Sequence, residues 1–140
     1  MFIDASAIVA IITYEDDRDV LLRRLDASKT PRYVAPTTVW ESAMAIAAIS
    51  AKLADEPLRA GHIQAARAAV AEFLQVADAK EIVVTADIGR KALDVAEQYG
   101  KRVRHPAQLN FGDCFAYACA KAYRVPLLYK GDDFSYTDLA

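Results

Sequence analysis

The sequence has no long apolar segment free of charge and no excess of positive charge. No stretch approaches the ~20 apolar residues that a membrane-spanning helix requires, and the opening residues 1–4 lack the basic region of a secretory signal. The 140 residues include 17 Lys and Arg against 19 Asp and Glu, which gives a net charge of −2. This balance excludes a strongly basic nucleic-acid-coating protein. We expect a cytoplasmic protein without a membrane partner.

Cysteine and histidine are also scarce, with two of each. Cys114 and Cys119 lie five residues apart in a segment with helical character, so they face different directions and do not suit a disulfide. A four-ligand zinc site is not expected either, because the chain has only two His and no second Cys pair. The two thiols are expected to be small buried apolar groups in a reducing compartment.

Hydrophobic residues make up 54% of the chain, enough for the core of one domain spanning residues 1–140. Four short apolar segments are typical of strands: residues 1–3, 33–35, 82–84 and 126–129. Six longer segments have helical periodicity: residues 6–14, 17–27, 37–53, 63–76, 87–99 and 111–123. Apolar strands that alternate with helices predict an α/β domain whose parallel sheet is covered on both faces.

Three acidic residues stand in apolar surroundings. Asp4 is the only charged side chain in residues 1–14, and Glu41 is the only one in residues 33–51. Asp113 is the only carboxylate in residues 105–120. An ionised carboxylate without a partner costs several kcal/mol to bury. No Lys or Arg is close to any of them in sequence, so a shared cation is one explanation.

Each acid also has a local explanation. The segment Thr38–Glu41 matches a capping box, Asn110–Asp113 matches a weaker one, and Asp4 can cap the helix that follows it. A shared site is favoured over three separate caps, because ligands of parallel sheets bind at the carboxyl ends of the strands, where these acids are expected to meet. Asp4 ends the first strand, and acidic residues 132 and 133 follow the last one.

A cluster of carboxylates without His or Cys is suited to Mg²⁺ or Mn²⁺. The chemistry that such a site supports best is hydrolysis of phosphodiester bonds. The sequence therefore predicts a metal-dependent nuclease.

The motifs resemble those of the PIN-domain ribonucleases, and more narrowly those of the VapC-type toxins of bacterial type II toxin–antitoxin pairs. The resemblance spans essentially the whole chain. It rests on the opening segment, the helix containing Trp40 and Glu41, and two specific motifs, Asn-Phe-Gly-Asp-Cys at 110–114 and Lys-Gly-Asp-Asp-Phe at 130–134. It implies a PIN-like three-layer α/β/α domain with a short parallel sheet of four or five strands.

The resemblance also implies a Mg²⁺-dependent (or Mn²⁺-dependent) endoribonuclease toxin. Its partners would be an RNA substrate, a cognate antitoxin that enters the acidic groove, and a second copy of the chain, giving a homodimer and a toxin–antitoxin hetero-oligomer. Asp4 and Asp113 would be the metal ligands and Glu41 would complete the catalytic group. Gly131 stands where many family members have an acid, so the fourth catalytic acid is Asp132 or Asp133. Asp132 is slightly favoured, with Asp133 in a supporting role.

Several other residues bear on the site. Ser6 and Asn110 are candidate supporting donors to the acids. Three basic residues form the densest positive segment and are candidates for RNA phosphate contacts, with a solvated loop as an equal alternative: Lys101, Arg102 and Arg104. Trp40 is expected in the core rather than as a base-stacking platform, and Asp87 is expected to cap a helix.

Two other function classes compete with the nuclease. A receiver-like signalling domain would use Asp87 as phosphoacceptor and Lys130 as its charge partner, but the isolated Asp4 and the pairs of helices between strands argue against it. A non-catalytic binding module on the same scaffold has no support in the sequence, because all the acids are present.

Overall fold

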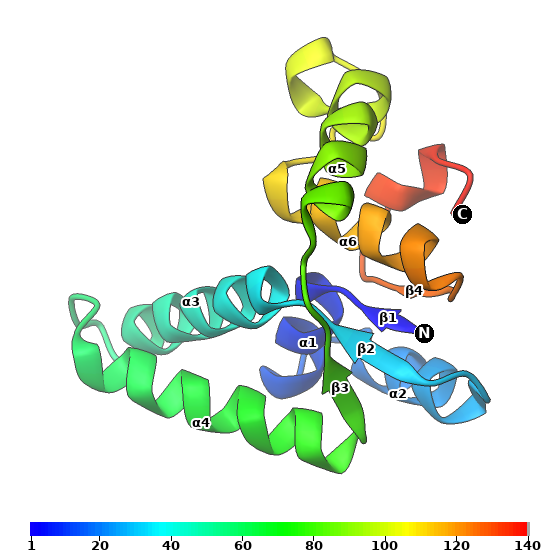
Figure 1. Ribbon diagram of the computed structural model, residues 1–140. Coiled ribbons are helices and arrows are strands. Elements are labelled where there is room, and N and C mark those ends of the chain that lie inside the picture. The colour runs from blue at the N-terminus through cyan, green and yellow to red at the C-terminus, as the bar shows by residue number, and fades with distance from the viewer. Residues whose placement is uncertain (140) are drawn as a thin grey trace.

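A computed structural model describes residues 1–139 and gives the arrangement of helices and strands shown in Figure 1. The strands are β1 (Phe2–Ile3), β2 (Arg32–Val34), β3 (Ala79–Glu81) and β4 (Leu127–Leu128). The α-helices are α1 (Ala5–Ile12), α2 (Arg18–Ala27), α3 (Pro36–Leu53), α4 (Ala60–Val76), α5 (Ala86–Tyr99) and α6 (Phe111–Tyr123). Two 3₁₀ turns follow α5 and β4, respectively: η1 (Lys101–Val103) and η2 (Asp133–Tyr136).

The four strands form a parallel sheet in the order β3-β2-β1-β4. Adjacent side chains of a strand point to opposite faces of the sheet. Each of the two-residue strands β1 and β4 therefore places one side chain on each face. Ile3 and Leu128 join one buried cluster, whereas Phe2 and Leu127 join the other. The sheet therefore forms the middle layer between two apolar cores, which confirms the predicted three-layer α/β/α architecture.

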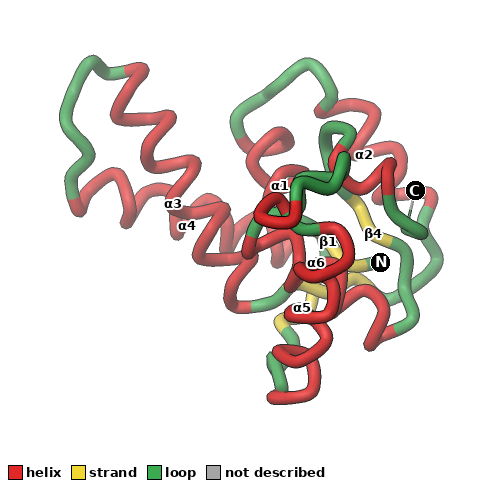
Figure 2. Tube along the Cα trace, turned by 90° about the horizontal axis from the view of Figure 1, so that it is seen from above, coloured by secondary structure: helices red, strands yellow, loops and turns green. Residues whose placement is uncertain are grey.

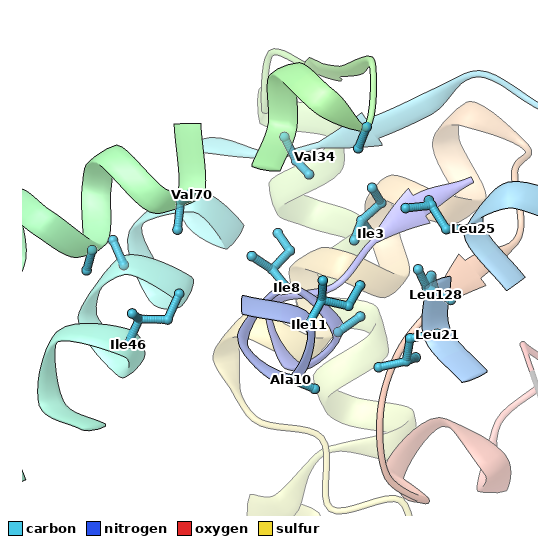
Figure 3. Packing of buried hydrophobic residues seen from close by; sticks show 14 of the residues in the cluster. Ile3, Ile8, Ala10, Ile11, Leu21, Leu25, Val34, Ile46, Val70 and Leu128 are labelled. Carbon is cyan, nitrogen blue, oxygen red and sulfur yellow. The ribbon is translucent and has the colours of Figure 1, made fainter. Parts of the chain in front are cut away.

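Helices α1 to α4 supply the first core, in which Ile8 and Ile11 of α1 lie at the centre (Figure 3). Helices α5 and α6 supply the second core on the opposite face. The long helices α3 and α4 pack along each other and extend as a helical hairpin beyond the edge of the sheet (Figures 1 and 2). Both cysteines are buried and unbonded in the second core, as expected.

One predicted strand is wrong in position. The apolar segment 82–84 was expected to form the third strand, but β3 consists of the more polar residues Ala79–Glu81. As the outermost strand, β3 needs backbone partners rather than apolar side chains, and it pairs along the whole of β2. Ile82 instead enters the core beneath α5 and α6. The other elements were predicted to within a few residues, and α6 at both ends.

Within residues 1–139, no helix is both long enough and apolar enough to span a bilayer.

Candidate functional site

Asp4 lies at the carboxyl end of β1, where its backbone N–H donates to the carbonyl of Leu128 at 2.9 Å. It is the N-cap of α1, and its Oδ2 accepts hydrogen bonds from the Ser6 amide at 2.9 Å and from the Ser6 hydroxyl at 2.5 Å. The side chain is buried. Burial raises its pKa, although the Ser6 hydrogen bonds oppose this shift. Asp4 is therefore both a helix cap and a buried acid.

Asp113 lies in the first turn of α6 and forms the predicted capping box with Asn110. Its Oδ2 accepts from the Asn110 amide at 2.7 Å, and its own amide donates to Asn110 Oδ1 at 3.1 Å. Burial is the main cause that raises the pKa of Asp113 to about 6, while the hydrogen bond from Asn110 acts in the opposite direction. The capping and site interpretations are thus compatible for this residue.

Glu41 has no capping role. Helix α3 begins at Pro36 with Ala35 as its N-cap, so Glu41 is well inside the helix and the predicted capping box at 38–41 is wrong. Its carboxylate instead lies against Gly112 of α6, where an added Cβ would come within 2.0 Å of Glu41 Oε2. A glycine in the first turn of a helix is a poor helix former, and this contact explains its presence.

The three acids act on one another electrostatically. Burial first, and then the charges of Asp4 and Asp113, raise the pKa of Glu41 to about 7. The charge of Asp4 also raises the pKa of Asp113. Throughout residues 1–139, none of the three forms a salt bridge with Lys or Arg. The fold therefore gathers mutually repelling carboxylates without a protein cation to neutralise them.

Of the two candidates for a fourth acid, Asp133 is the one whose charge acts on the buried acids. Its charge raises the pKa of both Asp4 and Asp113, whereas Asp132 has no such effect on either. Asp133 begins η2, which is anchored by the buried Phe134. Asp132 precedes that turn, and both acids are exposed.

Lys130 connects this acidic loop to the rest of the site. Its amide donates to Ser6 Oγ at 3.0 Å, so Ser6 joins the loop to Asp4. The Lys130 ammonium pairs with Glu15 and lies 3.7 Å from Asp17. Ser6 and Asn110 thus hold the predicted supporting positions, and the role of Lys130 in fixing the loop was not predicted.

A groove of about 530 Å³ adjoins Glu41, between the first turns of α3 and α6. Its lining includes Trp40 and Phe111, which are 68% and 70% exposed. The expectation that Trp40 lies in the core is wrong. Trp40 faces out of the helix because Ser42, Ala43 and Ile46 occupy the buried side of α3.

The remaining candidates lie apart from the acids. Lys101, Arg102 and Arg104 are exposed at the end of α5 that is farther from the sheet (Figure 1), and their contact with RNA stays a prediction. Asp87 is not the cap of α5, since Thr85 fills that position. It is exposed and pairs with Lys91 at 3.0 Å, while Lys130 pairs elsewhere, so the receiver-like arrangement is not favoured.

The donor chemistry of the acid group fits a hard divalent cation, because every side-chain donor is a carboxylate oxygen. As the side chains are oriented, no three carboxyl, imidazole or thiol groups in the described part of the chain lie close enough to hold one ion. Asp4 and Asp113 direct their Oδ2 atoms at protein donors instead.

Comparison with known proteins agrees with this arrangement. The PIN domain family model matches residues 1–139. A VapC ribonuclease of Rhizobium meliloti is 40% identical over 139 residues, covering 99% of this chain and 98% of the relative. Ribonuclease VapC of Mycolicibacterium smegmatis is 39% identical over 140 residues, covering 100% and 98%, respectively.

Among solved structures, VapC20 of Mycobacterium tuberculosis, described as a toxin that cleaves the sarcin–ricin loop, has the same fold. It aligns with a TM-score of 0.65 and 23% identity over 96% of this chain and 92% of the other. The family model matches nearly the whole chain, and the two ribonucleases are 39–40% identical to this chain over 98% of their own lengths. The chain belongs to the PIN-domain family and, within it, to the VapC ribonucleases.

Proposed function

We propose that this protein is a divalent-metal-dependent endoribonuclease that acts as the toxin of a toxin–antitoxin pair. The observation that supports it most strongly is the group formed by Asp4, Glu41 and Asp113, whose charges act on one another without a protein cation. The names of its relatives indicate RNA as the substrate.

In this proposal, Asp4 and Asp113 hold Mg²⁺ or Mn²⁺, and Asp133 rather than Asp132 is the fourth acid. The bound ion would polarise the scissile phosphate and stabilise the leaving oxygen. Glu41 would accept a hydrogen bond from the attacking water and orient it. Ser6 and Asn110 hold the Oδ2 atoms of Asp4 and Asp113, which fixes the direction of each carboxylate.

We further propose that the toxin acts in the cytoplasm as a homodimer and that a cognate antitoxin neutralises it by covering the acidic site. The exposed basic residues Lys101, Arg102 and Arg104 would contact RNA phosphates at a distance from the acids. A small protein that copurifies with the chain and stops RNA cleavage would identify the antitoxin.

The decisive test compares Asp4→Asn and Asp113→Asn with the wild-type protein on a natural RNA, with Mg²⁺, with Mn²⁺ and with a chelator. We expect both variants to lose cleavage, because each removes a charged metal ligand. Asparagine keeps an oxygen that can accept the capping hydrogen bond, so thermal stability without metal should be unchanged or higher.

Asp87→Asn is the matched control, because it removes an equally small acid from an exposed helix turn and should retain full cleavage. Cleavage by purified Asp113→Asn at the wild-type rate, or wild-type cleavage that persists in chelator, would refute the proposed mechanism.

A further inference from the structure

Two large aromatic rings are left in solvent beside the acid group. Trp40 and Phe111 are 68% and 70% exposed, although burial of an aromatic side chain normally contributes strongly to stability. Each ring is close in sequence to an acid of the site: Trp40 precedes Glu41 in α3, and Phe111 lies two residues before Asp113 in α6. Helices α3 and α6 therefore each carry an exposed aromatic ring next to an acid of the site.

The two rings line one groove rather than two separate surfaces. Its other lining residues are Pro36, Thr37, Glu41, Asn110 and Gly112, so it contains one carboxylate and no Lys or Arg. Phe111 packs against Phe115 one helical turn further along, with 4.7 Å between the ring centroids and an angle of 50° between the ring planes, so it has an aromatic neighbour of its own. A phosphate would find no positive charge here, whereas a flat uncharged group would find aromatic faces.

We propose that this groove is the binding subsite for one unpaired nucleobase next to the scissile phosphate, with Trp40 and Phe111 as base-stacking residues. The inference rests on the proposed ribonuclease function. A polymer whose phosphodiester bond lies at the acids must place a neighbouring nucleotide close to Glu41, and Glu41 forms one wall of the groove. Bases of single strands bind aromatic side chains by stacking.

One polar group in the groove is suited to reading the edge of the base. Asn110 Oδ1 accepts the hydrogen bond of the Asp113 amide, while the side-chain NH₂ donates to no acceptor in the described part of the chain. This NH₂ would donate to an acceptor on the edge of the bound base and help to hold the base in the groove; because all four bases present acceptors, it would not by itself select among them.

Binding is tested directly by fluorescence, because Trp40 is the single tryptophan of the chain. Short single-stranded oligoadenylate, oligocytidylate and oligouridylate are titrated into the wild-type protein in chelator, so that no cleavage occurs. We expect saturable quenching by at least one of them, and none by an abasic ribose-phosphate oligomer of the same length.

Cleavage is tested with Trp40→Leu and Phe111→Leu, which keep an apolar side chain but lose the ring, and with Trp40→Phe, which keeps a ring. Substrates are an oligoribonucleotide containing the preferred wild-type cleavage site and versions that are abasic on either side of the scissile bond. We expect each Leu variant to lower kcat/KM by about tenfold, chiefly through KM, and Trp40→Phe to restore most of the loss. On the version that lacks the stacked base, wild type and Leu variants should cleave equally.

Leu93→Ala is the control, since Leu93 is 67% exposed on α5 and outside the groove. Two results would overturn the inference: Leu variants that cleave the same sites as efficiently as wild type, or losses that persist undiminished on both abasic substrates. A change from dimer to monomer in the Leu variants, measured by light scattering, would also overturn it by assigning the groove to a contact between copies. Failure of the ribonuclease proposal is a different outcome, namely no metal-dependent cleavage of any RNA by the wild-type protein.

Discussion

The carboxylate of Glu41 in α3 lies against Gly112 of α6. The three atoms nearest to an added methyl group at position 112 all belong to the carboxyl group of Glu41. The end of a flexible side chain can move aside at little cost, so the fold should tolerate alanine at this position.

We therefore predict that Gly112→Ala folds with nearly wild-type thermal stability but loses about 100-fold in RNA cleavage, since small displacements of a catalytic group have effects of this size. Circular dichroism melting and cleavage rates measure the two quantities. Gly89→Ala is the control, because nothing lies near an added Cβ at that helical position. Full activity of Gly112→Ala would show that the position of the Glu41 carboxylate is not important.

The raised pKa values of the acid group predict how stability depends on pH without metal. Burial and the facing charges of Asp4 and Asp113 raise the pKa of Glu41 from 4.5 to about 7, and burial raises that of Asp113 from 3.8 to about 6. The folded state therefore binds protons more tightly than the unfolded state between about pH 4 and pH 7. The free energy of unfolding should fall as pH rises through this range and level off above it.

A shift of this size on Glu41 alone corresponds to about 3 kcal/mol, but water screens a partly buried group, so we expect on the order of 1 kcal/mol. Urea unfolding in chelator at pH 5 and pH 8 measures the difference. Glu41→Gln should reduce it, because glutamine does not titrate. Stability that is equal at both pH values, or higher at pH 8, would contradict the prediction.

At the scale of elements, Arg32 of β2 joins two helices to the sheet. Its guanidinium donates to the carbonyls of Ala77 at 2.8 Å and Leu25 at 3.1 Å, which lie at the C-terminal ends of α4 and α2. The end of a helix has unpaired carbonyls and a partial negative charge, so a cation there is favourable.

We predict that Arg32→Ala lowers the free energy of unfolding by about 2–4 kcal/mol, since two charge-assisted hydrogen bonds are lost. Arg32→Lys should recover only part of the loss, because one ammonium cannot reproduce the forked geometry. Urea unfolding measures both, with the exposed Lys80→Ala on neighbouring β3 as the control. An Arg32→Ala protein as stable as the control would show that other contacts hold these helix ends.

The elements also show why local sequence patterns were only partly informative. Helix α6 was predicted at both ends because the Asn110 capping box and the apolar periodicity are local properties of the chain. Strand β3 was misplaced because its position depends on backbone pairing with β2, and residues 79–81 have no apolar pattern that reveals this. Trp40 was misassigned because α3 is apolar on almost every side, and the periodicity does not show which side meets the core.

At the scale of the whole molecule, the chain has a net charge of −2 and gathers three of its acids at one place, which would attract a divalent cation. A divalent ion that binds only the folded state stabilises it by mass action, by about 2.7 kcal/mol at a hundred times the dissociation constant. We predict that Mn²⁺ or Mg²⁺ raises the melting temperature of the wild-type protein by several degrees.

The same ions should leave the melting temperature of Asp4→Asn and Asp113→Asn unchanged, while Asp87→Asn should respond like wild type. Thermal unfolding followed by circular dichroism, with chelator as the reference, provides the comparison. An equal rise in all four proteins would assign the ion to another part of the surface and separate metal binding from the acid group.

Three features could be recognised in the sequence alone, because each depends on residues that are close in sequence. They are the alternation of apolar strands with helices, the isolation of three acids in apolar segments, and the scarcity of sulfur and nitrogen ligands. They were enough to predict the three-layer fold and to single out Asp4, Glu41 and Asp113 as one candidate site. Other features were decided only when distant segments met: the contact of Glu41 with Gly112, the electrostatic effect of Asp133 and the exposure of Trp40 beside Phe111. These depend on how α3, α6 and the loop after β4 pack around the end of the sheet, and packing between distant segments leaves no local pattern in the sequence.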